Sequence, residues 1–374
     1  MRRLLVVASL LPLALVACRH SEDHDTEARR IPNHLQEQKI AFASRRHGPA
    51  VAPRPGTSAA DADIYVMNPD GSGVTRLTSD PSPSDASRGE HADIAPAWSP
   101  DGRMITFVRT DERPPLSPAA SLPAEEIYVM NSDGSDRRRL TRNTALDIAP
   151  DWLPDGRIVF VSCPPSEDEP PECALVAIRP DGSGREKLAQ LGAVYDLAVS
   201  PEGRRIAYAQ LEGQSHYQDF ELHVAHLDGS EHQQLTDDGT GDASPAWSPD
   251  GTRIAFVSNR AESAPCWTHD CVGYTNELYV MDADGGDVTR LSETPHEEQT
   301  PAWSPDGETI VFSRILDTHG MYELYVVNSD GSCPTRLIPG GSDLMPDWYG
   351  SANANADPLE RLKDFLGELR DLTC

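Results

Sequence analysis

The chain has 374 residues, of which 32 are basic and 60 are acidic, giving a formal net charge of -28. An acidic excess of this size repels nucleic acids and anionic lipid surfaces, so nucleic-acid binding is excluded as a function, while solubility and cationic partners are favoured. The length accommodates one large all-β domain or two smaller domains, so it leaves the fold open.

Residues 1–17 have the features of a secretory signal peptide. Two arginines precede an apolar run that is too short to span a membrane. The sequence Leu-Val-Ala-Cys at 15–18 resembles the lipobox of bacterial lipoproteins, and the resemblance implies cleavage before Cys18 and acylation of its thiol and new amine. Arg19 is not the aspartate of inner-membrane retention, so an outer-membrane anchor is expected. The alternative is an ordinary signal peptide with Cys18 there by chance.

Residues 18–38 are polar without apolar periodicity, which is typical of a flexible tether. Two motifs then alternate over residues 39–350. Copies of a tryptophan hairpin of the type PAWSPDGTRIAF begin at Pro96, Pro150, Leu197, Pro245 and Pro301, and an incomplete copy, PDWYG, begins at Pro346. Copies of a second motif, of the type IYVMNPDGSGVTRLT, begin at residues 64, 127, 175, 222, 278 and 324.

The two motifs together predict four short strands per repeat. Proline presets φ and glycine accepts the positive φ of a tight turn, so each Pro-Asp-Gly or Asp-Gly marks a hairpin. Six such units, none able to bury its own faces, predict an all-β fold, a six-bladed β-propeller of four-stranded blades. The segment KIAFAS at 39–44 supplies the strand missing after PDWYG, so the N-terminal strand is expected to complete the last blade and close the ring.

The last segment, residues 351–374, departs from the repeat. Asp357 is a suitable helix cap, Pro358 fits the first turn, and apolar residues recur at helical spacing, which predicts a C-terminal amphipathic helix over 357–372. Docking of this helix on the flank of the propeller is favoured over binding to a partner.

The two motifs, PAWSPDG followed by IAF and LYVMNxDGSxxxRLT, resemble the propeller repeat of TolB-like proteins over residues 39–350. The resemblance implies docking onto envelope lipoproteins through the propeller. A lipoprotein without the α/β domain of TolB is expected, because only a short segment separates Cys18 from residue 39. Similar repeats occur in propellers of prolyl-oligopeptidase-type peptidases and of lyases acting on plant-derived sugars.

Six cysteines remain beside Cys18, and an even number in an exported protein predicts disulfides. The candidate pairs are Cys163 with Cys173, Cys266 with Cys271, and Cys333 with Cys374. The first two pairs bracket short loops. A metal site with His269 is the disfavoured alternative for the second loop, since it lacks a fourth ligand.

The connections between strands differ between the two faces of such a ring. The turns within hairpins lie on one face and are short and uniform. The other face receives connections that all differ, namely 45–62, 110–124, 163–172, 211–219 and 259–275. Function is usually carried by variable loops held on a rigid frame, so this loop face is the candidate functional face.

An acidic residue recurs five positions before the repeat tryptophan, at Asp93, Asp147, Asp242, Glu298 and Asp343. These positions begin the innermost strands near the channel mouth, and a ring of carboxylates suits Ca²⁺, which takes oxygen ligands. The favoured alternative is structural, with the acids capping turns or pairing with repeat arginines. The arginines considered are Arg76, Arg139, Arg290 and Arg336. No cofactor is otherwise required.

Four residues outside the repeat pattern are candidates for contacting a partner or ligand. Trp267 and His269 lie in APCWTHDCVGY, and His216 and Tyr217 lie in EGQSHYQDF. Trp267 has no packing role in the repeat, and an exposed tryptophan can anchor a protein or stack on a sugar. The alternatives are a tryptophan folded back over the rim and, for the other residues, surface decoration.

No nucleophile elbow, zinc-binding helix or phosphate-binding loop is found in the sequence, so the protein is not expected to be an enzyme. The leading hypothesis is a monomeric, lipid-anchored propeller of the cell envelope that binds a protein, such as another lipoprotein. The alternative is a carbohydrate-binding or carbohydrate-active propeller, of lyase or hydrolase type, that uses the acidic channel mouth with Ca²⁺.

Overall fold

The structure of the protein is a computed structural model that describes residues 38–46, 62–79, 91–111, 124–165, 172–211, 220–261, 276–316 and 321–350. Every regular element within these ranges is a β-strand. No helix long and apolar enough to cross a membrane occurs in them. The predicted signal peptide, most of the predicted tether and the predicted C-terminal helix lie outside the described residues.

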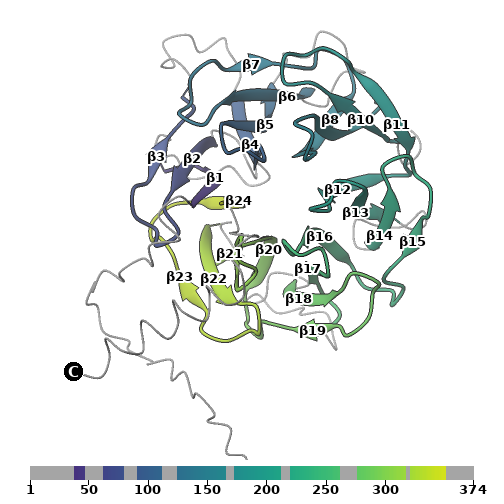
Figure 1. Ribbon diagram of the computed structural model, residues 1–374. Helices are drawn as coiled ribbons and strands as arrows, with labels where there is room; N and C mark the ends of the chain where they lie inside the picture. The colour runs from purple at the N-terminus through teal and green to yellow at the C-terminus, as the bar shows by residue number, and fades with distance from the viewer. Residues whose placement is uncertain are drawn as a thin grey trace, which may run out of the picture. The chain divides into compact units, whose positions relative to one another are not determined.

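The strands form six four-stranded sheets that are the blades of a ring (Figure 1). Blade A contains β24 (Asp343–Tyr349), β1 (Lys39–Ser44), β2 (Asp63–Met67) and β3 (Thr75–Arg76). Blade B contains β4 (His91–Trp98), β5 (Met104–Asp111), β6 (Ala124–Asn131) and β7 (Arg138–Arg139). Blade C contains β8 (Leu146–Trp152), β9 (Ile158–Cys163), β10 (Ala174–Ile178) and β11 (Glu186–Gln190).

The remaining three blades repeat the same order from the innermost to the outermost strand. Blade D contains β12 (Val194–Val199), β13 (Arg205–Leu211), β14 (Phe220–His226) and β15 (Gln233–Gln234). Blade E contains β16 (Asp242–Trp247), β17 (Arg253–Ser258), β18 (Glu277–Asp282) and β19 (Thr289–Arg290). Blade F contains β20 (Glu297–Trp303), β21 (Thr309–Ile315), β22 (Tyr322–Asn328) and β23 (Thr335–Arg336).

Blade A is built from both ends of the repeat region. Its second strand, β1, pairs antiparallel with β24 on one side and β2 on the other, with Ile40 opposite both Trp348 and Met67. At the other end of β1, Ser44 donates a hydrogen bond to Asp343 Oδ1 at 2.5 Å. The predictions of an all-β six-bladed propeller and of closure by residues 39–44 are confirmed.

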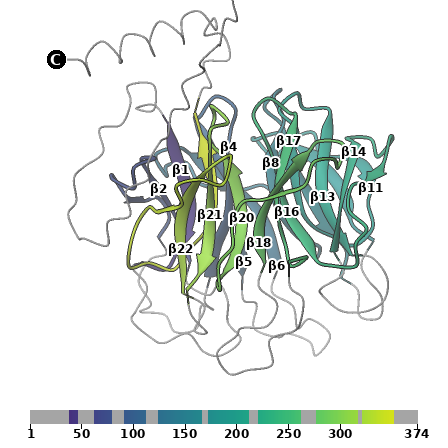
Figure 2. The same ribbon diagram turned by 90° about the horizontal axis from the view of Figure 1, so that it is seen from below.

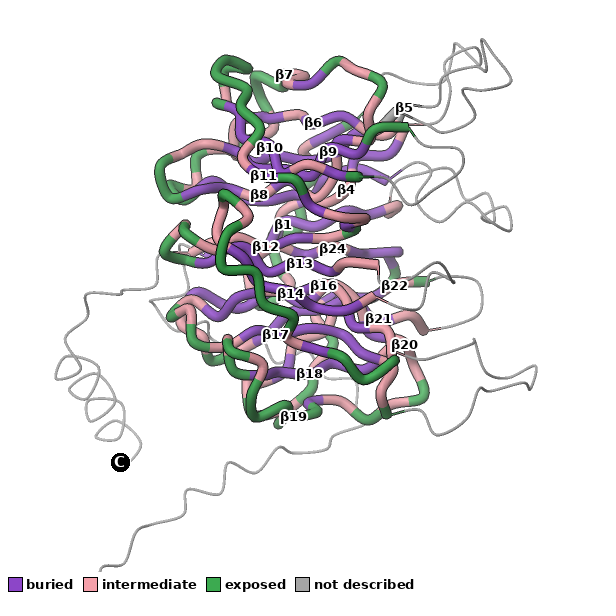
Figure 3. The backbone as a smooth tube through the Cα atoms, turned by 90° about the vertical axis from the view of Figure 1, so that its right-hand side faces the viewer, coloured by how far each residue is buried: buried purple, intermediate pink, exposed green. Residues whose placement is uncertain are grey.

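The hydrophobic core lies between neighbouring blades. Ile40 and Phe42 of blade A, for example, pack in one cluster with Val311 and Leu324 of blade F, and all four are fully buried. Figure 3 shows that burial is concentrated in the strands, while exposure is concentrated at the turns and outer edges. Each blade is therefore covered on both faces only when its neighbours are in place, as expected for a repeat architecture.

The hairpin turns on one face of the ring are uniform because their sequence fixes them. In blades B to F, every turn between the first and second strands has as many residues as the turn of blade B, which spans residues 99–103 (Figure 2). In that turn Ser99 Oγ donates to Asp101 Oδ1 at 2.7 Å, and Gly102 has φ of 67°. A Cβ on Gly102 would also lie 2.2 Å from the ring of Tyr349, so glycine is required for both its conformation and its contact.

One of the candidate disulfides is formed within the described residues. Cys163 and Cys173 are bonded and buried, and they tie the end of β9 to the residue before β10. Cys333 is also disulfide-bonded. Its suggested partner Cys374, like Cys266 and Cys271, lies outside the described residues.

Closure of the ring can be tested with a matched pair of core substitutions. Phe42→Ala in β1 and Phe312→Ala in β21 remove equivalent buried rings from the second strands of two blades. Each is expected to lower the free energy of unfolding by about 3–5 kcal/mol, measured by urea denaturation, because each leaves a cavity in an interblade core. A much smaller loss for Phe42→Ala would mean that β1 is not an integral strand of the ring.

Candidate functional site

The five carboxylates singled out in the sequence lie at or near the start of the innermost strands and are almost fully buried. A bulge separates each of them from the repeat tryptophan. In β4, for example, the pairing register with β5 shifts between Ile94 and Ala97, and Ala95 has φ of 49°. Such a bulge lets the two halves of one strand aim their side chains independently.

Four of the five carboxylates pair with an arginine from the second strand of the same blade or just beyond it. The pairs are Asp93 with Arg109, Asp242 with Arg260, Glu298 with Arg314, and Asp343 with Arg46. In the first pair, Arg109 Nε and Nη2 donate to the two oxygens of Asp93 at 2.6 and 2.7 Å. The fifth, Asp147, accepts hydrogen bonds from Ser162 and Asn143, with Arg185 Nη1 at 3.9 Å.

The arginines that the sequence suggested as partners bind a different set of carboxylates. The observed pairs are Arg76 with Asp63, Arg139 with Glu126, Arg290 with Glu277, and Arg336 with Glu323. The suggested pairing with the innermost acids is therefore wrong. The second acidic series was visible in the sequence, because each member lies directly before the Ile-Tyr-Val or Leu-Tyr-Val of the second motif.

These two series meet at the junctions between blades. At the junction of blades E and F, for example, Ser292 Oγ lies within hydrogen-bond distance of both Glu277 and Glu298 and can donate its one proton to either, while Arg290 and Arg314 pair with those two acids. The junctions B/C and F/A have the same composition of two carboxylates and two guanidinium groups, and A/B has a third guanidinium group, because Arg137 Nη1 lies 3.8 Å from Asp93. Each buried acid at these junctions therefore has a guanidinium group close by, and burial still raises the pKa of Glu298 to about 7 and that of Asp63 to about 6.

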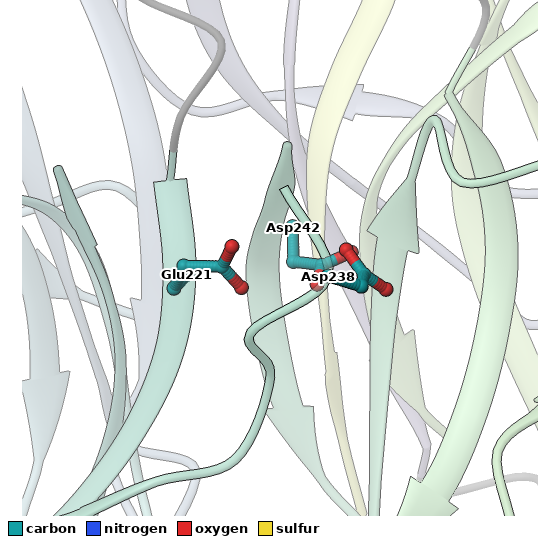
Figure 4. A group of neighbouring side chains, drawn as sticks. All are labelled: Glu221, Asp238 and Asp242. Carbon is teal, nitrogen blue, oxygen red and sulfur yellow. The ribbon is translucent and has the colours of Figure 1, made fainter. Parts of the chain in front are cut away.

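The junction of blades D and E is different. Gln234 stands opposite His223 in the pairing of β14 with β15, where blades A, B, E and F have arginine opposite tyrosine. Glu221 consequently has no arginine from β15. Asp238 joins it instead, and the ligand atoms of Glu221, Asp238 and Asp242 lie within 4.8 Å of one another (Figure 4). Arg260 pairs with both aspartates, at 3.3 Å to Asp238 and 2.7 Å to Asp242.

The electrostatic consequence appears at Glu221. Burial, together with the nearby Asp242 and Asp238 carboxylates, raises the pKa of its carboxyl to about 7, against a hydrogen bond from Thr236 that lowers it. This carboxyl is only 5% exposed. Within the described residues, Glu221, Asp238 and Asp242 are the one group of three acidic, histidine or cysteine side chains close enough to share a metal ion. Only Asp242 belongs to the five metal ligands predicted from the sequence.

A further set of carboxylates holds neighbouring innermost strands together. Asp347 Oδ2 accepts a hydrogen bond from the Trp98 amide at 2.7 Å, and Asp151 Oδ2 accepts one from the Val199 amide at 2.7 Å. Burial raises the pKa of Asp151 to about 7 and that of Asp347 to about 6. These acids satisfy backbone donors of the next blade, which is a structural use.

The four candidate contact residues, His216, Tyr217, Trp267 and His269, lie outside the described residues, as does the lipidation candidate Cys18. Their segments nevertheless begin or end at the junction of blades D and E. β14 starts directly after 212–219, and Arg260 lies just before 262–275. Glu221, and the arginine that pairs with Asp238 and Asp242, are thus next in sequence to these two segments.

Six closed four-stranded blades define a β-propeller scaffold, and its repeats resemble those of TolB-like propellers. No protein-family model matches the chain. It is 27% identical over 193 residues to the uncharacterized peptidase YuxL of Bacillus subtilis, a match covering 50% of this chain and 27% of that protein. It is 26% identical over 160 residues to the Tol-Pal system protein TolB of Bordetella pertussis, covering 34% of this chain and 35% of that protein.

Among solved structures, TolB from Acinetobacter baumannii superimposes with a TM-score of 0.59 at 18% identity, covering 85% of this chain and 68% of that chain. The resemblance to TolB-like propellers is confirmed at the level of the fold. The chain spans only about a quarter to a third of the length of the two curated relatives named above.

The expectation that the protein is not an enzyme is contradicted by these comparisons. A relative named as a peptidase shares half of this chain, so the absence of a catalytic motif does not exclude an enzymatic function. A catalytic site assembled from loop residues of several blades carries no local sequence signature, which is why motif searching is a poor test here.

The raised pKa of Glu221 at the D/E junction predicts how the free energy of unfolding depends on pH. The folded state holds the Glu221 proton more tightly than the unfolded chain does, so stability is lost as pH rises from about 4.5 to about 7. With a chelator present, Glu221→Gln is expected to raise the free energy of unfolding at pH 8 by about 1–2 kcal/mol and to leave it unchanged near pH 4.5.

The matched control is Glu277→Gln, which leaves Arg290 without its buried carboxylate. Urea denaturation at pH 8 is expected to show a loss of about 3 kcal/mol for this variant. A destabilised Glu221→Gln protein would show that Glu221 is already compensated in the fold.

Proposed function

We propose that the protein is a lipid-anchored propeller of the bacterial cell envelope that binds a protein partner through its loop face. The observation that carries the proposal is the contrast between the two faces. The first-to-second-strand turns have one length throughout blades B to F, whereas the second-to-third-strand connections range from 316–321 to 259–276. Binding surfaces are commonly built from loops of different lengths held on a rigid scaffold, and the loop face of this ring has that organisation.

The envelope location is proposed on two grounds. The leader ends in Leu-Val-Ala-Cys, which resembles the lipobox of exported lipoproteins. A relative of the chain is a Tol-Pal system protein, and the TolB fold covers most of the sequence. Within the loop face, the region next to the D/E junction is favoured for the contact, because Trp267, His269, His216 and Tyr217 belong to the two segments that meet the described chain there.

Action on peptides is a second candidate, favoured by the relative named as a peptidase. It concerns the same face, because a peptide substrate and a protein partner both present an extended chain or loop to the propeller. Release of fragments from a peptide mixture by the purified protein would establish it. Binding without turnover would leave the binding module as the function.

Partner capture gives the direct test. The tagged protein is cross-linked in its native envelope, and bound proteins are identified by mass spectrometry. Trp267→Ala is expected to reduce recovery of the partner at least tenfold. Truncating an aromatic residue at the centre of an interface commonly costs about 2 kcal/mol or more of binding free energy. Val288→Ser, at a 41% exposed position in a turn on the opposite face, is the control and should leave recovery unchanged. Equal recovery from all three proteins would contradict the assignment of the loop face.

Lipid anchoring is tested separately at Cys18. Metabolic labelling with a fatty acid is expected to label the wild-type protein, and Cys18→Ser is expected to abolish the label and release the protein from the membrane fraction. Labelling that persists in the variant would rule out the proposed site of acylation.

A further inference from the structure

The junction of blades D and E has the geometry of a small oxygen-ligand site. Glu221 comes from the start of β14, Asp238 from the connection between β15 and β16, and Asp242 from the first residue of β16. Their ligand atoms all lie within 4.8 Å of one another. Two oxygens bound to one Ca²⁺ at about 2.4 Å are separated by no more than about twice that distance, so the three carboxylates are close enough to share an ion.

Charge counting sets this junction apart from its four equivalents. At A/B, B/C, E/F and F/A, two carboxylates are matched by at least two guanidinium groups. At D/E, Arg260 is the one arginine or lysine that forms an ion pair with any of the three carboxylates within the described residues. Gln234 occupies the position of the missing arginine, and neither Glu221 nor Asp242 is accessible enough for water to screen its charge.

A buried oxygen at this junction also lacks a partner. Asp242 is fully buried, and its carboxylate lies close to those of Glu221 and Asp238 (Figure 4). Oδ2 accepts from Arg260, whereas Oδ1 has no hydrogen-bond donor. The hydroxyls of Ser258, which lies opposite Asp242 in the pairing of β16 with β17, and of Thr236 are close enough to this carboxyl to act against the rise in its pKa that burial causes, but neither has hydrogen-bond geometry at Oδ1.

The same position in other blades shows what is missing. Ser44 donates to Asp343 Oδ1 at 2.5 Å, and Ser162 donates to Asp147 Oδ1 at 2.6 Å. A buried carboxylate oxygen without a donor is costly and calls for a ligand that supplies positive charge.

We propose that Glu221, Asp238 and Asp242 bind a Ca²⁺ ion that takes the place of the arginine missing from the D/E junction. The ligand set is carboxylate oxygen only, which a hard cation prefers over the nitrogen and sulfur ligands chosen by zinc. Ca²⁺ is favoured over Mg²⁺ because it tolerates irregular geometry and carboxylates in either mono- or bidentate mode. This site is distinct from a ring of innermost acids around the channel mouth, because two of its three ligands are not innermost acids.

A bound ion would also brace the two segments that carry the candidate contact residues. Glu221 directly follows Phe220, the first described residue after 212–219, and Arg260, which holds both aspartates, lies just before 262–275. The inference stands without the proposed partner, because it concerns only the ion and the described junction.

Calcium titration of the purified protein tests the site. Isothermal titration calorimetry is expected to give one saturable binding event with a dissociation constant of about 1 mM or lower, the range of extracellular calcium modules. At about ten times that concentration, Tm is expected to rise by about 3 °C. The absence of saturable binding up to about 10 mM Ca²⁺ would overturn the proposal.

Three variants distinguish the site from diffuse attraction to an acidic surface. Gln234→Arg restores the arginine of the other junctions, and it is expected to raise Tm without Ca²⁺ and to weaken Ca²⁺ binding at least tenfold. Asp238→Asn is expected to weaken binding at least tenfold. Asp237→Asn makes the same charge change at the neighbouring exposed residue and should bind as the wild type does. Equal affinities of the Asp237→Asn and Asp238→Asn proteins, or unchanged binding by Gln234→Arg, would contradict the assignment.

Discussion

Pairing of β1 with β24 closes the ring, and the packing of every blade depends on that closure. The apolar faces of a blade are covered by its two neighbours, so an open array would leave one face of each terminal blade and the edge of an incomplete sheet in water. Ser44 and Asp343, which meet in blade A, are separated by 299 residues in sequence. The closing contacts are therefore among the most non-local of the fold, and such contacts form late in folding.

Charge compensation is the second requirement that the ring imposes. Acids occur at the same places in successive blades, where they lie buried between sheets. At four junctions each of the two acids pairs with an arginine. One arginine comes from β3 or its equivalent, and the other comes from the second strand of the next blade or from just beyond it. The exception is Asp147, which lies near Arg185 instead. The D/E junction keeps the acids and loses one arginine. The replacement of arginine by Gln234 in blade D is informative because the equivalent blades show which side chains the packing of the junction requires.

Much of the fold could be predicted from the sequence. The repeated Trp and Asp-Gly motifs specified strands, turns and blade number, and the incomplete copy at Pro346 together with 39–44 specified the closure. The ion pairs could not be predicted in the same way. Proximity in sequence suggested Arg76 and its equivalents as partners of the innermost acids, but a bulge redirects those acids toward arginines such as Arg109 on the adjacent strand. The sequence shows glutamine at 234 where four other repeats have arginine. The consequence for Glu221, which lacks an arginine partner from β15, could be seen only in the structure.

The position of β1 within blade A has a mechanical consequence. β1 is an interior strand, hydrogen-bonded along its length to β24 and β2, rather than an edge strand. A pulling force transmitted through the residues that precede Lys39 acts along this strand and loads the hydrogen bonds on both of its sides together. Such shear loading is resisted by many bonds at once, whereas an edge strand peels away bond by bond. The ring is thus joined to its N-terminal segment at a strand suited to bear tension.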